Sequence, residues 1–350
     1  MTGLVYDEVF LEHGVEHHPE SAERLEVCMQ RLRETGLLDE MRRLPTRPAE
    51  IEELCWIHSE QYVMEVRDLS RAGGGDLDLD TRATEMTWDA ARLAAGGCID
   101  AARAVHAREA DNALCLVRPP GHHARPGRGM GFCFFNNLAI AAQALIRDGA
   151  TSVAIVDFDG HHGNGTHEAF YHREDVLYIS LHQTPLFPGT GSIGEIGVEA
   201  GFGRTMNLPF PPHAQDIHHL RAFDEVVMPA LAAYQPDAIL VSAGFDPHFR
   251  DPLVQLSLTA RGFFLMTVGL LTAARDLCDG RLTCVLEGGY DLQIGLPESV
   301  EATARALMRK PEAQWHQLDP PPHPEQTRRV DEAVDEVIRQ HKERQQAPNA

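Results

Sequence analysis

The chain has 350 residues, 43% of them hydrophobic and 24% charged, which is typical of a globular protein with a large core. Its formal net charge of −21 argues against a nucleic-acid surface, which needs clustered Lys and Arg. The first residues lack the basic and apolar regions of a secretory signal, and no apolar run approaches the roughly 20 residues of a membrane span. We therefore expect neither nucleic acid nor membrane as a partner, although the charge is compatible with cationic substrates.

The cysteines indicate a reducing compartment. They are odd in number, widely spaced and contain no Cys-x-x-Cys pair, so we expect neither a disulfide framework nor a thiolate zinc site. We interpret most of them as small buried hydrophobic groups, with the cytoplasm as the default location. They are Cys28, Cys55, Cys98, Cys115, Cys133, Cys278 and Cys284.

Helical and extended patterns alternate along the chain. Two helices are predicted first, over Pro19–Thr35 and, interrupted at Gly96-Gly97, over Thr84–Arg108. Further elements follow in the order strand Ala113–Val117, helix Asn137–Arg147, strand Ser152–Asp157, strand Val176–Leu181, helix Asp216–Tyr234, strand Ala238–Ala243, helix Thr259–Cys278 and strand Leu282–Leu286. This alternation predicts an α/β fold with a central, mainly parallel β-sheet flanked by helices on both faces.

Residues 1–317 contain nothing that resembles a domain linker, so we interpret them as a single domain. A Pro-rich segment begins at Leu318 and precedes an amphipathic helix predicted over Gln326–Arg344. We expect this C-terminal part, residues 318–350, to pack on or near the domain.

The most informative segment is Asp157–Gly165, which directly follows an apolar strand. In an extended chain Asp157, Asp159 and His161 alternate onto one face, where their oxygens and nitrogens can bind one metal ion. Ligands bind at the carboxyl ends of strands in open α/β sheets. A polar turn with solvated histidines is the alternative, but it does not explain why acids precede histidines at every second residue.

Other strand ends also carry polar side chains. His122 and His123 follow the strand that begins at Ala113, on a turn rich in Pro and Gly. Asp246 and Tyr290 follow the last two predicted strands. Each signal is weak alone, but parallel strands would bring all of them to one edge of the sheet.

Together these residues favour a hydrolase. Asp159, His161 and Asp246 supply one nitrogen and two oxygen ligands and leave positions open for water and substrate, as a catalytic zinc requires. Zinc lowers the pKa of water that it binds to about 7, and a neighbouring histidine can accept the proton. A tyrosine hydroxyl can stabilise the oxyanion of a tetrahedral intermediate. The set predicts hydrolysis of an amide or ester.

Seven ordered motifs, within a match from about His18 to about Leu307, are similar to those of the histone deacetylase and acetylpolyamine amidohydrolase family. They are Arg118–Ala124, Gly131–Cys133, Asp157–Thr166, Ser180–His182, Phe187–Gly191, Ser242–Asp246 and Glu287–Tyr290. The resemblance implies the arginase/deacetylase fold. It also implies a zinc-dependent deacetylase that hydrolyses the linear amide C–N bond of an acetylated amine to acetate and free amine.

Carried over by position, the resemblance implies the same three zinc ligands. His123 would act as general base and then acid, with His122 as its electrostatic partner, and Tyr290 would polarise the acetyl carbonyl. Asp157 would pair with His122, and Asn164 with His123. Asn rather than Asp at position 164 resembles the class II branch and should make His123 less basic.

The resemblance also implies a potassium site and a substrate channel. The potassium ligands would come from Asp157, Asp159, His161, Ser180 and Leu181. Phe132 and Phe187, otherwise ordinary core aromatics, would line the channel, and the Gly131 carbonyl would accept a hydrogen bond from the substrate amide. Arg24 either lines an inner cavity from which acetate leaves or is a salt-bridged helix residue. His162 receives no ligand role, and we interpret it as structural.

Leu253 bears on the choice of substrate. It stands where polyamine-preferring members of the family place an acid, so it favours acetyl-lysine in proteins or peptides. An acetylpolyamine or another small acyl amide is the alternative, and the acidity of the chain could attract such a cation. The sequence leaves the physiological target, the oligomeric state and the metal loaded in the cell open.

Two other functions fit less well. An arginase-like dinuclear manganese hydrolase would need a further acid where this chain has Gly163. A non-catalytic acyl-binding module would have lost the tyrosine or a histidine, yet Tyr290, His122 and His123 are all present.

Overall fold

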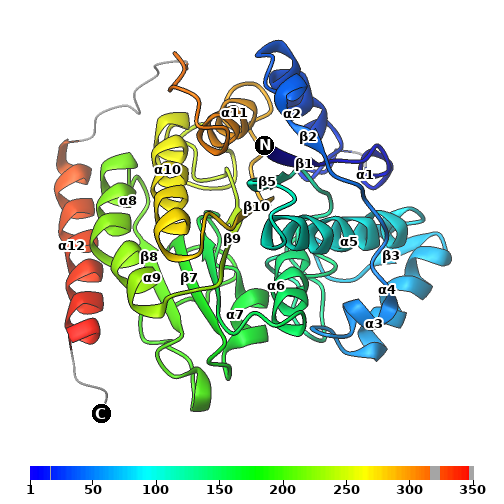
Figure 1. Cartoon of the computed structure of the whole chain (residues 1–350), viewed down its shortest axis with the longest axis horizontal. Coiled ribbons are helices and arrows are strands. Elements are labelled where there is room, and N and C mark those ends of the chain that lie inside the picture. Colours follow the sequence, from blue (N-terminus) through cyan, green and yellow to red (C-terminus); the bar gives the residue numbers. More distant parts are fainter. Residues whose placement is uncertain (16, 316–323, 347–350) are drawn as a thin grey trace.

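The structure, a computed structural model, describes residues 1–15, 17–315 and 324–346. Its centre is an eight-stranded sheet in the order β2-β1-β5-β10-β9-β6-β7-β8, in which every neighbouring pair is parallel (Figure 1). The strands are β1 (Thr2–Val5), β2 (Arg42–Arg43), β5 (Asn112–Cys115), β6 (Val153–Asp157), β7 (Val176–Gln183), β8 (Thr205–Phe210), β9 (Ala238–Ala243) and β10 (Leu282–Leu286). A separate antiparallel pair joins β3 (Gly74–Asp76) to β4 (Arg82–Thr84).

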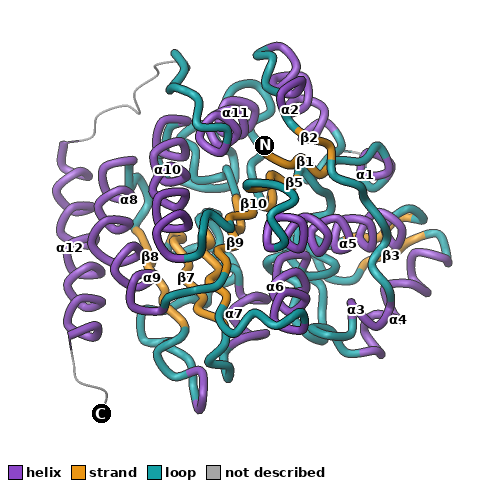
Figure 2. The backbone as a smooth tube through the Cα atoms, in the orientation of Figure 1, coloured by secondary structure: helices purple, strands orange, loops and turns teal. Residues whose placement is uncertain are grey.

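Helices cover both faces of the sheet, which confirms the predicted α/β fold (Figure 2). On one face lie α5 (Thr87–His106) and α6 (Asn137–Arg147), and on the other lie α2 (Glu23–Glu34), α10 (Ala260–Leu277) and α11 (Gly295–Leu307). The remaining helices are α1 (Val9–Glu12), α3 (Ile51–Leu54), α4 (Glu60–Arg71), α7 (Asn164–Phe170), α8 (Asp216–Ala222), α9 (Met228–Tyr234) and α12 (Pro324–Gln346). Because both faces are covered, every residue of β6, β9 and β10 is buried, and most residues of these strands are apolar.

The predicted interruption of a helix at Gly96-Gly97 is wrong, because α5 is continuous through both residues. A Cβ on Gly96 would lie 2.0 Å from the Arg47 carbonyl oxygen, and one on Gly97 would lie 2.8 Å from Val5 Cγ1. The glycines therefore allow two chain segments to approach the helix closely. A glycine costs about 1 kcal/mol in a helix interior, which such packing can offset.

The predicted helix Asp216–Tyr234 is continuous but not uniform. Between α8 and α9 the five residues Phe223–Val227 form a π-helix. Pro229 follows at the start of α9, where its missing N–H and its ring disfavour a regular α-helical turn.

Three strands of the sheet are not predicted by the sequence. The edge strand β2 has two residues, which is too short for a pattern. The opposite edge strand β8 contains Pro209, which cannot donate to a neighbouring strand and is tolerated at a sheet edge. Strand β1 is short, with four residues, and contains Gly3, which weakens a strand pattern. The glycine is explained by packing, because a Cβ on it would lie 2.6 Å from Leu44 Cδ1.

The C-terminal helix α12 lies beside α8 and the edge strand β8 (Figure 1). Val334 and Ile338 are buried in the main core, and His341 Nε2 is 2.8 Å from the Asn207 carbonyl oxygen. The Pro-rich segment from Leu318 to residue 323 lies outside the described residues. The division of the chain after residue 317 stays a prediction. Among the described helices, none is long and apolar enough to cross a membrane.

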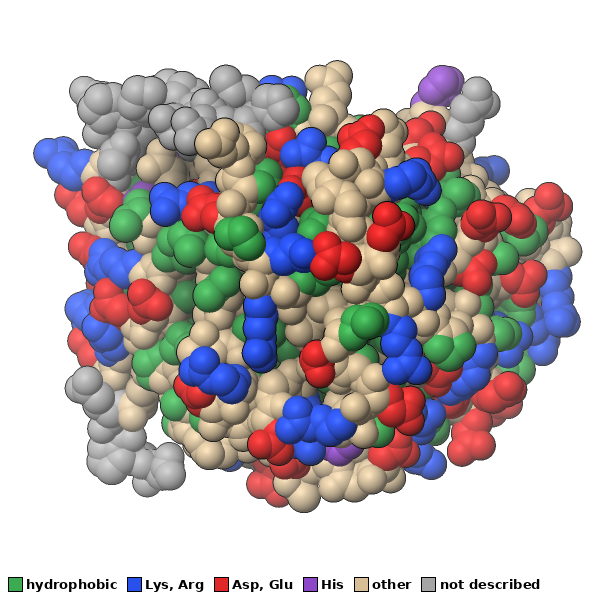
Figure 3. Space-filling model, turned by 45° about the horizontal axis from the view of Figure 1, so that its top comes forward, with side chains coloured by type: hydrophobic (Ala, Val, Ile, Leu, Met, Phe, Trp, Pro, Cys, Tyr) green, Lys and Arg blue, Asp and Glu red, His purple; other side chains and the backbone are tan. Residues whose placement is uncertain are grey.

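Charged side chains of both signs are mixed on the surface. On the face shown in Figure 3, Lys and Arg are interspersed with Asp and Glu. All seven cysteines are free thiols, and all except Cys55 are buried.

A buried ion cluster attaches the N-terminal segment to the end of β5. Arg118 and Arg24 are fully buried, and Glu20 is almost fully buried between them. Arg118 Nη2 donates to Glu20 Oε2 at 2.8 Å, and Arg24 Nη1 donates to Glu20 Oε1 at 3.1 Å. Burial alone would raise the pKa of Glu20, but the two guanidinium groups outweigh burial and lower it to about 2.

We predict that Glu20→Gln lowers the free energy of unfolding by about 3–5 kcal/mol, because it leaves buried guanidinium groups without a counter-charge. In the wild type the folded pKa lies below the ordinary value of 4.5, so the contribution of Glu20 is complete above that pH. It is lost as the pH falls toward 2. Urea unfolding at about pH 5 and about pH 3 should show this loss in the wild type and not in the variant. Exposed Glu34→Gln is the control, and an equal effect would contradict the prediction.

Candidate active site

The carboxyl ends of neighbouring strands form the candidate site. The loop after β5 carries the histidine pair, and the loop after β10 carries Tyr290. Next in sheet order, β9 is followed by Asp246 and β6 by Asp159 and His161. All these side chains except Asp246 line or border one hollow of about 250 Å³, and Asp246 contacts His161 directly. The structure therefore brings together the polar side chains at these strand ends, as the sequence predicts.

Asp159, His161 and Asp246 can hold one metal ion. His161 Nδ1 is 2.7 Å from Asp246 Oδ2 and 3.2 Å from Asp159 Oδ1, and both acids are buried. One ligand atom from each residue lies within 4.8 Å of the other two. No other group of three His, Cys, Asp or Glu residues among those described meets this distance.

Backbone N–H groups orient the two acids. Gly288 donates to Asp159 Oδ2 and Gly160 donates to Asp246 Oδ1, both at 2.7 Å. Each carboxylate therefore directs its other oxygen toward His161. Two buried acids need a partner, and one imidazole nitrogen with two carboxylate oxygens fits a catalytic zinc. The donor set thus fits the ion implied by the sequence motifs.

The adjacent histidines have opposite electrostatic environments. His122 Nδ1 is 3.1 Å from Asp157 Oδ2, and His123 Nδ1 is 2.7 Å from Asn164 Oδ1. Burial opposes protonation of His122, but nearby carboxylates, above all Asp159, raise its pKa to about 10. Burial and the neighbouring imidazoles lower the pKa of His123 well below its usual value. The surroundings therefore favour the cationic form of His122 and the neutral form of His123, a separation typical of acid–base sites.

Two aromatic rings lie on the wall of the hollow. Phe132 is 5.9 Å from the ring of Tyr290 between centroids, and Phe187 is 5.1 Å from His123. Phe132 has φ of 68°, which is costly for a bulky residue and common at functional sites. At Gly131, where φ is 56°, a Cβ would lie 2.5 Å from His123 Cδ2.

Tyr290 is held by two partners. The Arg24 guanidinium lies 4.8 Å from the centroid of its ring and donates through Nε to the Gly289 carbonyl oxygen at 2.8 Å. The Tyr290 N–H donates to Asp251 Oδ2 at 2.7 Å. The other oxygen of Asp251 accepts the N–H of Leu253, which borders the hollow and is 37% exposed. The Asp251 carboxylate therefore connects Tyr290 with Leu253, the residue that bears on substrate choice.

The residues expected to bind potassium lie at the ends of β6 and β7. Asp157 and Ser180 are paired in register, and Leu181 follows Ser180 in the same buried strand. Asp157 Oδ2 accepts from the Tyr178 hydroxyl at 2.9 Å, and Ser180 Oγ is 2.9 Å from His182 Nδ1. These positions are compatible with the site, and potassium binding stays a prediction.

The sequence prediction misses three supporting residues. Glu287 Oε2 accepts the N–H groups of Gly121 and His122, at 2.7 and 3.1 Å, and so holds the histidine loop. Tyr178 and Asp251 have the contacts described above. The signal for Tyr178 and Glu287 is a polar group within or directly after a buried apolar strand, whereas the role of Asp251 depends on a contact 39 residues away.

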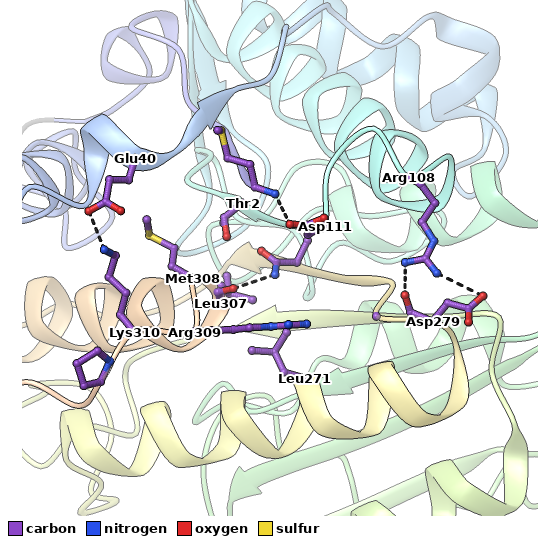
Figure 4. A pocket seen from close by; sticks show the side chains of 14 residues that line it. Thr2, Glu40, Arg108, Asp111, Leu271, Asp279, Leu307, Met308, Arg309 and Lys310 are labelled. Atoms are coloured by element: carbon purple, nitrogen blue, oxygen red, sulfur yellow. Dashed lines mark hydrogen bonds and ion pairs between the residues drawn. The ribbon is translucent and has the colours of Figure 1, made fainter.

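A larger hollow, about 560 Å³, lies beside the amino ends of β1 and β5, whereas the candidate site lies at the carboxyl ends of the strands (Figure 4). Three of its acids are paired with cations: Asp111 with the amino group of Met1, Glu40 with Lys310, and Asp279 with Arg108. Its described lining contains no His or Cys. The residues that the motifs predict to carry the chemistry lie instead at the carboxyl ends of the strands.

The fold and the site together define a hydrolase of amide bonds. The chain belongs to the histone deacetylase family, since the Histone deacetylase domain matches residues 18–307. Membership in this family makes the protein a deacetylase or amidohydrolase that acts on an acetylated substrate.

Individual relatives agree with this assignment. A probable deacetylase of Archaeoglobus fulgidus is 44% identical over 300 residues, 85% of this chain and 83% of that protein. A histone deacetylase-like amidohydrolase of Pseudomonas aeruginosa is 42% identical, over 78% of this chain and 72% of its own length. The crystal structure of the HDA15 HD domain superposes with a TM-score of 0.86 at 35% identity, covering 97% of this chain and 94% of that one.

We predict that Gly288→Ala lowers metal affinity roughly 10- to 100-fold, the usual effect of disturbing groups that orient metal ligands. A Cβ at this position would lie 2.6 Å from both Asp159 Oδ2 and Asp246 Oδ2, so the acids must move. Metal content after dialysis against graded chelator measures the effect, and circular dichroism checks the fold. Gly127→Ala is the control, because its Cβ would meet no atom within 4 Å. Equal metal retention in both variants would refute the orienting role of Gly288.

Proposed function

We propose that this protein is a zinc-dependent deacetylase that releases acetate from acetyl-lysine in proteins or peptides. The observation that carries the proposal is the buried Asp159–His161–Asp246 group beside two histidines of opposite charge preference. A non-catalytic acyl-binding module would need the three metal ligands but not the pair of histidines.

The three ligands would hold zinc, which when bound polarises an amide carbonyl and lowers the pKa of water. His123 is the general base in this proposal. The Asn164 carbonyl oxygen accepts the Nδ1 proton of His123, which leaves the Nε2 lone pair to take a proton from water. After water adds to the carbonyl carbon, His123 returns that proton to the amine nitrogen as the C–N bond breaks.

His122 and Tyr290 stabilise negative charge. His122, kept cationic by Asp159 and Asp157, favours the oxyanion that develops on the carbonyl oxygen. The Tyr290 hydroxyl donates a hydrogen bond to the same oxygen, and Asp251 holds the backbone of Tyr290 in place.

The channel residues select an extended acyl amine. Phe132 and Phe187 contact the alkyl chain, and the Gly131 carbonyl accepts the substrate amide N–H. Leu253 places an apolar group at the mouth, where an acid would attract the distant ammonium of a polyamine. This position supports acetyl-lysine over an acetylpolyamine.

Potassium would stabilise the strand ends below the zinc ligands. Carbonyl and carboxylate oxygens are the ligands suited to such a hard cation. The in-register pairing of Asp157 with Ser180, beside the buried Leu181, supports a site that also uses the carbonyls of Asp159 and His161.

We also propose a catalytic domain over residues 1–317 and a cytoplasmic location. Free cysteine thiols support a reducing compartment. The packing of α12 on β8 supports the attachment of this helix to the domain surface, within the proposed C-terminal part, residues 318–350.

Chelation and Tyr290→Phe test the mechanism. We expect a chelator to abolish hydrolysis of an acetyl-lysine peptide and added zinc to restore it. Tyr290→Phe should lower kcat about 10²–10³-fold, the usual cost of one oxyanion donor. Tyr6→Phe, remote from the hollow, serves as control. Activity that survives both treatments would exclude the mechanism.

Leu253→Glu tests substrate choice. We expect the wild type to hydrolyse acetyl-lysine peptide faster than acetylputrescine or acetylspermidine. The variant should gain roughly fivefold in kcat/KM for acetylspermidine, since one favourable charge contact contributes about 1 kcal/mol, and Leu253→Gln should not. Fastest turnover of acetylpolyamines by the wild type would overturn the substrate assignment.

A further inference from the structure

His162 has no part in the proposed reaction, yet it shares a hollow with a second histidine. His162 and His167 both line a cavity of about 460 Å³, together with Thr190 and Glu195 from the loop after β7. Their ring centroids are 5.0 Å apart and the rings are nearly perpendicular. Asn164, the partner of His123, lines the same cavity.

Each imidazole has a buried nitrogen without a partner. Neither His162 Nε2 nor His167 Nδ1 makes a hydrogen bond to any described residue. Buried polar atoms in this state are rare and call for an explanation. Two of them on neighbouring rings in one cavity indicate a shared ligand.

The contacts of His162 fit a metal ligand. Its Nδ1 is 2.8 Å from Thr190 Oγ1, and a metal-bound histidine usually donates its second N–H to such an oxygen. A Cβ on Gly191 would lie 2.6 Å from His162 Cγ, so this loop packs directly on the ring. Burial lowers the pKa of His167, which keeps that imidazole neutral and able to coordinate.

We propose that His162 Nε2 and His167 Nδ1 form a second metal site for a divalent transition ion such as Zn²⁺, with Glu195 as the third ligand. Imidazole nitrogens with one carboxylate suit zinc, and metal–nitrogen bonds of about 2.0–2.1 Å need less room than a bridging water. Both nitrogens are closed to solvent, which favours a bare ion over an organic ligand.

The second site should be weaker than the first. Glu195 Oε2 accepts the Gly191 N–H at 3.0 Å, and only the Asp159–His161–Asp246 group has its ligand atoms preassembled among the described residues. At least one of the three ligands must therefore move to complete the second site. We expect it to fill only when metal is in excess.

Metal at this site should slow the reaction through Asn164, a consequence that rests on the proposed function. Asn164 holds His123 at 2.7 Å and lies on the wall of the cavity. Displacement of its side chain would disturb the hydrogen bond that fixes the His123 tautomer.

Counting bound metal tests the site independently of activity. Zn²⁺ titrated into the dialysed full-length enzyme should reach two equivalents, measured by calorimetry and elemental analysis. His167→Gln and Glu195→Gln should each lose the weaker equivalent and keep the tight one. His172→Gln, an exposed rim residue paired with Glu199, is the matched control and should keep both. A single equivalent in the wild type, or two in His167→Gln, would overturn the proposal.

Inhibition separates this proposal from the proposed function. Excess Zn²⁺ should lower kcat of the wild type on acetyl-lysine peptide, and His167→Gln should need at least about tenfold more zinc for equal inhibition, because it has lost one proposed ligand. Two equivalents without deacetylation would refute the function and retain the site. Deacetylation with one equivalent would retain the function and refute the site.

Discussion

Four carboxylates buried at the carboxyl edge of a parallel sheet constrain the rest of this structure. They belong to Asp157, Asp159, Asp246 and Glu287, and none is more than 1% exposed. Buried charges persist only where N–H groups, cations or metal ions compensate them. The backbone approaches these acids closely, and a Cβ on Gly244 would lie 2.0 Å from Asp159 Oδ2. Glycines are therefore needed beside these acids, because a residue with a Cβ would keep the backbone from approaching the carboxylates this closely.

This constraint connects folding with chemistry. Asp159, which orients toward His161, also raises the pKa of His122 together with Asp157 and Glu287, while burial and the His122 ring lower the pKa of His123. A parallel sheet covered on both faces supplies the closed surroundings in which such interactions are strong. The proposed reaction depends on this arrangement at the strand ends.

How well the sequence predicts the fold depends on burial. Strands β9 and β10 are predicted with their observed bounds, because strands buried on both faces are continuous apolar runs. The edge strands β2 and β8 are missed, since one is too short and the other contains Pro209. The continuity of α5 at Gly96 depends on contacts with Arg47, which local propensity does not contain.

The sequence by itself determined the residue types that can carry the chemistry and the family to which they belong, because motifs at strand ends preserve both identity and spacing. Only the tertiary structure decided how these groups act on one another. The orientation of Asp251 toward Tyr290 and the unpartnered nitrogens of His162 and His167 arise from packing between separate segments. Hydrogen-bond partners, burial and charge proximity are properties of three-dimensional contacts, and no local pattern in the chain specifies them.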